Sequence, residues 1–296
     1  MALQTVLPYS PTLELVPLQP DHIPAISRIC YAAFSGLQSR HRIHVDIPDV
    51  ETAGMIISHV ANRPDYTGVV AILDGQVVGS NFLLHADEVA GVGPITVDPT
   101  VQSQGIGRSL MAWATQEVQR RGIRQVRLFQ EAVNAISLSL YTSVGFAWRD
   151  SAALMQAVPA AADSPLVRPL GQADLPAVAA LSRQAYGFSR ASDAAQLLAA
   201  DFPGFILERQ GVPAGYWIAS LFGHGCAETD EDLLTLVGHG TRHLPPPFAV
   251  FICPLSRAEG FRRCLQAGHR TLKMLSYMSY GDFVAPSGLY LPSIQC

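Results

Sequence analysis

The chain reads QSQGIGR at residues 102–108, between a short apolar segment at 95–97 and a long amphipathic segment at 105–121. The first segment predicts a strand, and the second predicts a helix that starts at the two glycines. Gly105 and Gly107 let the backbone approach a bulky anion, and the N–H groups and positive dipole at a helix start bind phosphate oxygens. This turn therefore predicts a diphosphate site.

Two other phosphate-binding loops fit these residues poorly. A Walker A loop needs Lys and then Ser or Thr after its last glycine, whereas Arg108 and Ser109 follow here. A dinucleotide-binding loop needs a third small residue where Leu110 stands, and an acidic residue at the end of the next strand. Two glycines at a strand-to-helix turn also occur where only tight packing is needed, so the turn alone leaves the ligand open.

A second pattern, N-x-x-S-x-x-L-Y-x-x-x-G-F, lies at residues 134–146 and predicts a helix closed by Gly145 at its C′ position. Asn134 and Tyr141 are separated by two helical turns, so both side chains and that of Ser137 lie on one face. Asn134 also suits the N-cap of this helix. The opposite, apolar side is expected to comprise Ile136, Leu140 and Val144.

The sequence repeats itself in its second half. Aligning residues 14–34 with 166–186 gives each copy a short strand, a polar turn and a helix entered through Pro24 or Pro176. Residues 157–165 are small and include prolines, which is the composition of a linker.

We therefore expect an α+β protein of two tandem domains, 1–160 and 161–296. Each should have a central mixed, mostly antiparallel sheet flanked by helices. In the first, Asp74 and Gly75 predict the turn of a hairpin.

Composition excludes several classes of function. Of the 296 residues 49% are hydrophobic and 15% charged, which favours a compact domain structure, and a net charge of −4 without a basic cluster argues against nucleic acid. The five cysteines form no C-x-x-C pair, and no apolar run is long enough for a membrane span. We expect a cytoplasmic protein without membrane partners and without a metal. Four histidines were considered as metal ligands and show no convincing spacing: His41, His44, His239 and His243.

Together the two motifs resemble those of the GNAT family of acyl-CoA-dependent N-acetyltransferases, and the resemblance in element order covers about residues 13–155. It implies the GNAT fold, acetyl-CoA as co-substrate, direct attack of an amine on the thioester, and Tyr141 as the general acid. The residues that it implies for coenzyme binding are Ile95, Thr96, Val97, Gln102, Ser103, Gln104, Gly105, Ile106, Gly107, Arg108, Ser109, Asn134, Ser137 and Tyr141. The stretch 35–46 lies where the acceptor-binding loop of the family usually follows the first helix.

The strand before the glycine turn carries no carboxylate, although many members of the family have their general base there. Pro94 in this strand predicts a bulge or an edge. Asp87, Glu88 and Glu131 remain as candidate bases, and a chain of water molecules is an alternative.

The second copy departs further from the family pattern. Matching Gly145 with Gly268 places Cys264 at the position of Tyr141 and Arg257 at that of Asn134. Residues 230–240 are expected to leave too little chain for a full glycine loop and helix. We therefore expect no second coenzyme site, and a second domain that shapes the acceptor pocket. The apolar segment 288–294 is expected to be docked, in a structural role or reaching the cleft.

The resulting hypothesis is an N-acetyltransferase acting on an amine of a small molecule or peptide. A different class of function, a CoA-responsive binding module with little catalysis, is an alternative hypothesis. Transfer of a longer acyl chain is an alternative within the enzyme class. The sequence leaves the acceptor open, and it allows a monomer or a homodimer.

Overall fold

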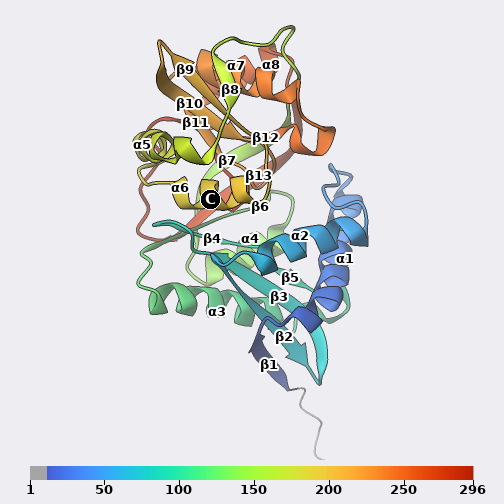
Figure 1. Cartoon of the computed structure of the whole chain (residues 1–296). Coiled ribbons are helices and arrows are strands. Elements are labelled where there is room, and N and C mark those ends of the chain that lie inside the picture. Colours follow the sequence, from blue (N-terminus) through green and yellow to red (C-terminus); the bar gives the residue numbers. More distant parts are fainter. Residues whose placement is uncertain (1–11, 296) are drawn as a thin grey trace, which may run out of the picture.

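The computed structural model describes residues 12–295, which form two lobes stacked one on the other (Figure 1). The first lobe contains β1 (Leu13–Pro17), α1 (Ile23–His41), α2 (Val50–Asn62), β2 (Tyr66–Leu73), β3 (Gln76–Leu84), β4 (Ala90–Val92), β5 (Thr96–Val97), α3 (Ile106–Arg120), β6 (Gln125–Glu131), α4 (Ala135–Ser143) and β7 (Ala147–Gln156). The second contains β8 (Val167–Pro169), α5 (Leu175–Tyr186), α6 (Ala191–Ala199), β9 (Gly204–Arg209), β10 (Val212–Ile218), β11 (Gly225–Ala227), α7 (Asp230–Thr241), β12 (Val250–Pro254), α8 (Ala258–Gln266), β13 (Arg270–Gly281) and β14 (Leu289–Leu291).

The elements of the first lobe follow the local sequence signals. Asp74 and Gly75, with φ values of 50° and 80°, make the predicted turn between β2 and β3. The predicted repeat is also present. In the first lobe β1 is followed by α1, and in the second β8 is followed by α5 after a connection of the same length. Both helices carry a proline in their first turn. The predicted α+β fold of two repeated units is confirmed.

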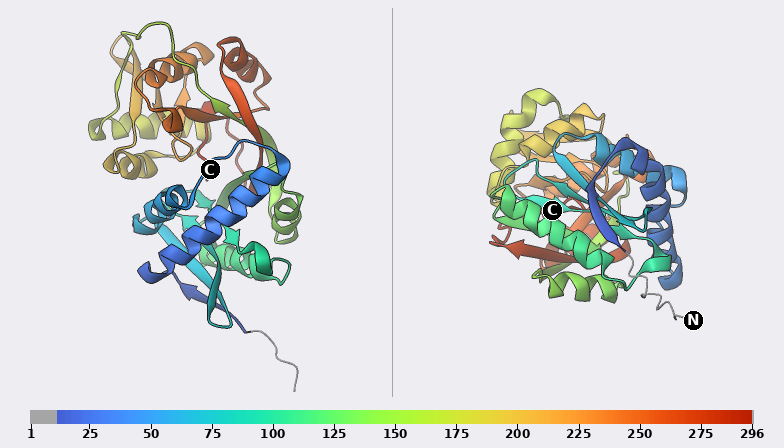
Figure 2. Two further views of the ribbon diagram at one scale, coloured as in Figure 1. Left: turned by 90° about the vertical axis from the view of Figure 1, so that its right-hand side faces the viewer. Right: turned by 90° about the horizontal axis from the view of Figure 1, so that it is seen from below.

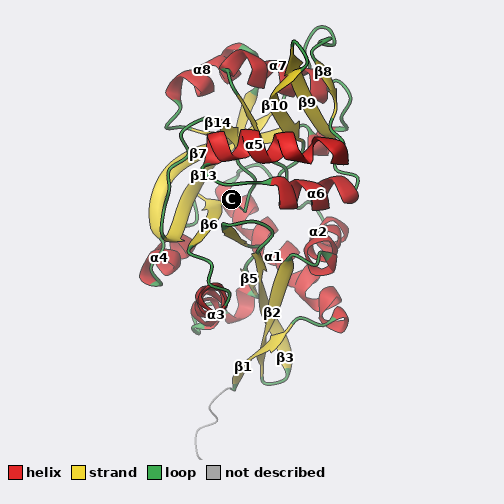
Figure 3. Ribbon diagram, turned by 60° about the vertical axis from the view of Figure 1, so that its left-hand side comes forward, coloured by secondary structure: helices red, strands yellow, loops and turns green. Residues whose placement is uncertain are grey.

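The two halves of the chain exchange strands. In the nine-stranded sheet the order is β1-β2-β3-β4-β6-β13-β7-β12, with β5 paired to β3 alone. Strand β13, from the second half, therefore lies between β6 and β7 of the first half, while β7 lies between β13 and β12 of the second. Figure 3 shows β7 and β13 as two long neighbouring strands that run from one lobe into the other. The predicted boundary near Ala160 thus does not separate two independently closed sheets.

Strands β4 and β6 are parallel neighbours for only a short distance. They pair at Ala90 with Val126 and at Gly91 with Arg127, after which β5 continues beside β3 without pairing to β6. The Gly93-Pro94 peptide is cis and lies at the break between β4 and β5, where the proline predicted an interruption. The sheet therefore opens between residues 95–97 and the end of β6.

The second lobe closes the corresponding gap with its own chain. Its five-stranded sheet has the order β14-β11-β10-β9-β8, so β14 pairs with β11 at the place where the first lobe opens. Figure 2 shows the two lobes from two further sides, with the two sheets meeting in the middle of the molecule. None of the helices in residues 12–295 is long and apolar enough to span a membrane.

The exchanged strand contributes to the core of the lobe that receives it. Met278 on β13 is fully buried among Leu128, Tyr141 and Phe146 of the first lobe. Tyr277, its neighbour, faces the other side of the sheet and stacks on Phe129 with ring centroids 4.8 Å apart.

We expect Met278→Ala to lower the free energy of unfolding by about 2–5 kcal/mol, because it leaves a cavity in the core of the first lobe. Met274 lies on the same strand but is 37% exposed, so Met274→Ala should cost less than about 1 kcal/mol. Urea unfolding of both variants measures the difference. Equal losses would contradict the assignment of β13 to the core of the first lobe.

Candidate active site

The turn between β5 and α3 presents a row of backbone N–H groups to solvent. Ser103 and Gly105 have φ values of 70° and 85°, which bend the chain so that successive amides point outward. Within the described residues, the N–H groups of residues 103–108 have no hydrogen-bond acceptor, whereas that of Ser109 begins the ladder of α3 by donating to Gly105 O at 3.0 Å. Residues 102–105 are exposed, so no side chain fills the turn. These amides and the positive end of α3 suit an anion.

The turn, the open strand edge and α4 lie close together. A side chain added at Gly107 would lie 3.1 Å from Leu140 on α4 and 3.9 Å from Val97 on β5. Ile95 and Val97 are half-buried, and Thr96 is buried and paired with Ser80 on β3. Their edge toward β6 pairs with no strand, and Val97 O accepts from Gln102 Nε2 at 3.4 Å.

Helix α4 turns Tyr141 toward the protein interior, with Asn134 and Ser137 half-buried on the same side. Asn134 caps the helix by accepting from Ser137 N at 3.0 Å, and Tyr141 is buried with its ring 6.3 Å from that of Phe146. Burial raises the pKa of Tyr141 to about 12, although the hydrogen bond with Ser137 lowers it slightly. The expected apolar face is wrong at Ile136, which is 73% exposed because Tyr141 occupies the inner side of the helix.

Two of the three candidate bases make contacts with the second lobe. Asp87 accepts from the backbone N–H groups of Ser192 and Asp193 at 3.1 and 3.2 Å and so holds the start of α6. Glu88 is exposed and lies 3.4 Å from Arg183.

Glu131, the third, is 6% exposed and lies at the end of β6. Its Oε1 accepts from Gln38 Nε2 and Lys273 Nζ, each at 2.7 Å, and Lys273 also pairs with Asp46. Its Oε2 is buried without a hydrogen-bond partner among the described residues. Phe129 and Glu131 alternate with Leu128 along β6, so they lie on the face of the sheet opposite to the Tyr141 core.

Sequence reasoning missed Lys273 and Gln38, because one lies 142 residues from Glu131 and the other 93. The stretch 35–46, expected as a loop, continues α1 as far as His41, so His41 is helical. It still contributes Gln38 and Asp46 to the Glu131 group.

A segment following β14 passes between the lobes where β4 and β6 separate. Phe129 N donates to Ile294 O at 3.3 Å, and Gln295 Nε2 donates to Gly93 O at 2.5 Å. A side chain at Gly91 would lie only 2.6 Å from Gln295 O, so this glycine leaves room for the segment. The prediction that residues 288–294 are docked is confirmed, and their continuation reaches the Glu131 face of the opening.

The corresponding region of the second lobe has lost the features that favour an anion. Helix α8 matches α4, with Arg257 at its N-cap and Cys264 at the position of Tyr141. Helix α7 is a full 12-residue helix, which corrects the expectation of too little chain; Thr229 caps it by accepting from Asp232 N. Only Glu228 and Thr229 separate β11 from α7. The second lobe therefore has the helix but lacks the glycine loop that precedes α3 in the first lobe. Three acidic residues in the first turn of α7 would repel a phosphate.

The sequence profile of the acetyltransferase (GNAT) family matches residues 34–146, which include the glycine turn and α4. The first lobe belongs to the GNAT family. Within this family, a mycothiol acetyltransferase of Nocardia farcinica is 39% identical over 101 residues, which are 33% of this chain and 30% of that protein. The [ribosomal protein bS18]-alanine N-acetyltransferase of Escherichia coli K12 is 42% identical over 52 residues, or 18% of this chain and 35% of that enzyme. The chain thus spans about a third of the length of these curated relatives.

Solved GNAT structures share the two-lobed arrangement. A protein of Pyrococcus horikoshii, described as a candidate acetyltransferase, superposes with a TM-score of 0.78 at 14% identity, covering 99% of this chain and 98% of that one. A tandem GNAT protein from the clavulanic acid biosynthesis pathway gives 0.56 at 13% identity, covering 93% and 100%. At such identities the likeness shows the fold alone, here a tandem GNAT fold.

A buried ion network joins the two GNAT lobes beside the opening. Asp193 on α6 accepts from Arg63 of the first lobe and from Arg190 of the second, each at 2.6 Å. Burial acts to raise the pKa of Asp193, but the charges of Arg190 and Arg63 outweigh it and lower the pKa to about 2. The depressed value stabilises the folded state above the unfolded pKa of about 3.9, and this contribution is lost as the pH falls toward 2.

We expect Asp193→Asn to lower the free energy of unfolding by about 3 kcal/mol at pH 7, because it removes the buried negative charge that both Arg63 and Arg190 face. The difference from the unaltered protein should shrink as the pH falls from 4 to 2, since the native carboxyl is then protonated. Asp282 pairs with Arg124 at an exposed site, so Asp282→Asn is the matched control and should cost less than about 1 kcal/mol. Urea unfolding at several pH values tests both, and a difference that stays constant with pH would rule out the ionic role.

Proposed function

We propose that this protein is an acetyl-CoA-dependent N-acetyltransferase with one coenzyme site, in the first lobe. The observation that carries the proposal is the row of amides at residues 103–108, which have no acceptor in the described part of the chain. In this account these amides and the side chains of Gln102, Arg108 and Ser109 hold the diphosphate. The free edge at residues 95–97, together with Asn134 and Ser137, holds the pantetheine arm. The family profile over residues 34–146 and the sequence matches to curated acetyltransferases support this reading.

Tyr141 is proposed as the general acid. A hydroxyl whose pKa is raised to about 12 stays protonated at neutral pH and can give its proton to a departing thiolate. Its burial in the core of the first lobe fixes the ring between α4 and the sheet, and Ser137 is its polar neighbour.

Glu131 is proposed as the general base. Its Oε2 is buried on the face of the opening opposite to Tyr141 and has no hydrogen-bond partner among the described residues. Lys273 and Gln38 hold Oε1, so the free oxygen is kept in one orientation. The acceptor amine would lose its proton to Glu131 and attack the thioester carbonyl carbon. The carbon–sulfur bond then breaks, and Tyr141 protonates the sulfur. Acid and base would act from opposite faces of the sheet.

The second lobe is proposed to bind no coenzyme and to form part of the acceptor side of the site. Two features support the absence of a second coenzyme site. Helix α7 starts with acidic residues, and β14 pairs with β11 where the first lobe has its opening. A role in the acceptor side is supported by two parts of the second half that reach the opening. Lys273 bonds to Glu131, and Gln295 bonds to Gly93.

The proposed acceptor is an amine of a small molecule or of a peptide terminus, the two kinds of acceptor named by the curated relatives. A cytoplasmic location is proposed as well, in keeping with four free thiols among the described residues, Cys30, Cys226, Cys253 and Cys264. The chain is proposed to act as a monomer or a homodimer.

Coenzyme binding is tested by replacing, one at a time, two glycines that lie at opposite ends of α3. Gly105 and Gly122 both have positive φ and open space where a side chain would be, so replacing either by alanine adds a similar backbone strain of about 1–2 kcal/mol. We expect Gly105→Ala to weaken coenzyme A binding at least tenfold by calorimetry, because the amides are reoriented. Gly122→Ala should bind coenzyme A as the unaltered protein does. Equal affinities in the two variants would place the diphosphate elsewhere.

Catalysis is tested by following free thiol release from acetyl-CoA with a panel of small amines and peptide N-termini. Tyr141→Phe and Glu131→Gln should each lower kcat by about 10²–10⁴-fold while coenzyme A binding is retained. Tyr280→Phe is the control, because its hydroxyl accepts from Gln119 outside the proposed site. If Tyr141→Phe is as active as Tyr280→Phe, Tyr141 is not the acid.

One observation favours a second candidate function, a CoA-responsive binding module. The segment around Ile294 and Gln295 occupies the acceptor side of the opening through direct hydrogen bonds to Phe129 and Gly93. Tight acetyl-CoA binding without turnover over the whole amine panel would select this alternative, and multiple turnovers would exclude it.

A further inference from the structure

The segment between the lobes is fixed against the end of helix α7. Residues 157–166 contain no helix or strand. Ala160 N donates to Gly238 O at 2.9 Å, and a side chain at position 238 would lie 3.1 Å from Ala160 Cβ. Arg242 donates from Nη1 to Ala160 O at 2.7 Å and from Nε to Asp163 Oδ1 at 2.8 Å. These contacts bring Asp163 to the C-terminal end of α7.

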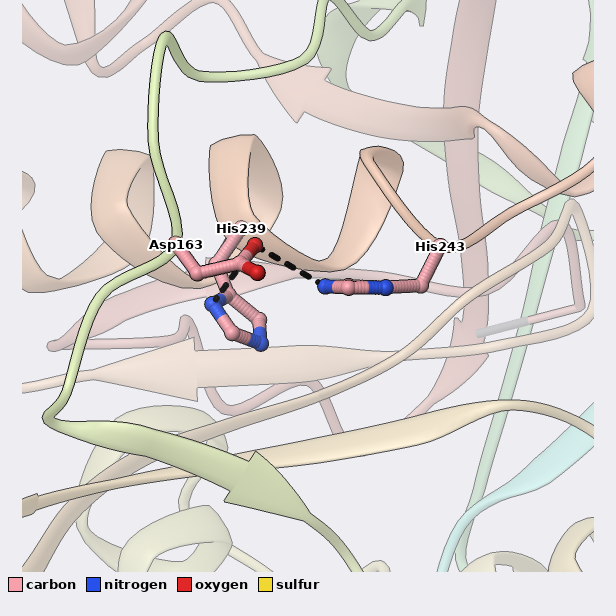
Figure 4. Close-up of side chains that lie close together, drawn as sticks. All are labelled: Asp163, His239 and His243. Carbon is pink, nitrogen blue, oxygen red and sulfur yellow. Dashed lines mark hydrogen bonds and ion pairs between the residues drawn. The ribbon is translucent and has the colours of Figure 1, made fainter.

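Two histidines face this carboxylate. His239 lies in the last turn of α7 and His243 follows the helix, and Figure 4 shows both rings turned toward Asp163. Asp163 Oδ1 is 2.9 Å from His243 Nε2 and 3.7 Å from His239 Nδ1, and one ligand atom of each residue lies within 4.8 Å of the other two. The spacing of the histidines alone did not indicate a site, because the third residue lies 75 or more positions earlier in the chain.

The protonation of His239 leaves one contact in this cluster unsatisfied. Ser164 N donates to His239 Nδ1 at 3.1 Å, so Nδ1 carries a lone pair and no proton. Asp163 Oδ1 therefore faces a second lone pair without a hydrogen between them, and Asp163 Oδ2 accepts no hydrogen bond from residues 12–295. A cation between Asp163 Oδ1 and His239 Nδ1 would replace the repulsion of these two acceptors by attraction to both.

The geometry points to a divalent metal site formed by Asp163, His239 Nδ1 and His243 Nε2, with Zn²⁺ as the best match to two imidazoles and a carboxylate. Asp163 and His243 are about half exposed, so water completes the coordination. Binding requires His243 Nε2 to give up its proton, Arg242 Nε to release Asp163 and Ser164 N to release His239 Nδ1, while Arg242 Nη1 keeps its bonds to the backbone of the segment. The site would tie the connection between the lobes to α7, independently of the proposed enzymatic function.

The test is a calorimetric titration of Zn²⁺ into the full-length, tag-free protein after treatment with a chelator. We expect about one ion per chain, and at least tenfold weaker binding in His243→Ala, which removes a half-exposed side chain and so leaves the fold intact. His41→Ala, an exposed histidine at the end of α1, is the matched control and should bind as the unaltered protein does.

A second measurement separates this site from zinc bound to other groups. Added Zn²⁺ should raise the Tm of the unaltered protein and of His41→Ala, but not that of His243→Ala. Absence of binding, or equal affinity and equal Tm shifts in all three proteins, would overturn the proposal.

Discussion

The position of β13 between β6 and β7 determines the architecture of this protein. An unpaired strand edge in the middle of a sheet leaves a row of backbone groups without partners, so β6 and β7 need a strand between them. The second half of the chain supplies it, and β7 in turn pairs with β12. Each lobe thus completes the sheet of the other, so the backbone pairing of β6 and β7 depends on strands from the second half of the chain.

This exchange also shapes the candidate active site. Because β13 pairs along β6, it carries Lys273 to Glu131, and the chain that follows β13 returns between the lobes to Gly93 and Phe129. The opening between β5 and β6 therefore has one side, the proposed coenzyme side, built from the first half and a second face to which both halves contribute. The opposite lobe shows what removes such a site: β14 takes the open edge of β11, and acidic side chains occupy the helix start. The repeated fold is retained in both lobes, while the glycine turn before the helix is present in one.

Local signals explain which features the sequence predicts. The glycine turn, the helix with Asn134, Ser137 and Tyr141, and the repeat of strand, turn and helix depend on residues close together in the chain, and the structure places them as expected. The exchange of strands was not predictable, because β7 and β13 have the same apolar pattern whichever neighbours they pair with. The partners of Glu131 were missed for a related reason, since Lys273 and Gln38 reach it through the topology. Ile136 was assigned to the buried side because it is apolar, whereas the bulk of Tyr141 decides which side of α4 faces the sheet.

The central claim is that one diphosphate binds the amides of residues 103–108 and none binds at α7. A crystal structure of the full chain grown with coenzyme A tests it most directly. The account predicts electron density for a single coenzyme, with its diphosphate at the start of α3 and its thiol end directed toward Tyr141. A diphosphate at the start of α7, or a turn at residues 103–108 left empty at saturating coenzyme, would contradict it.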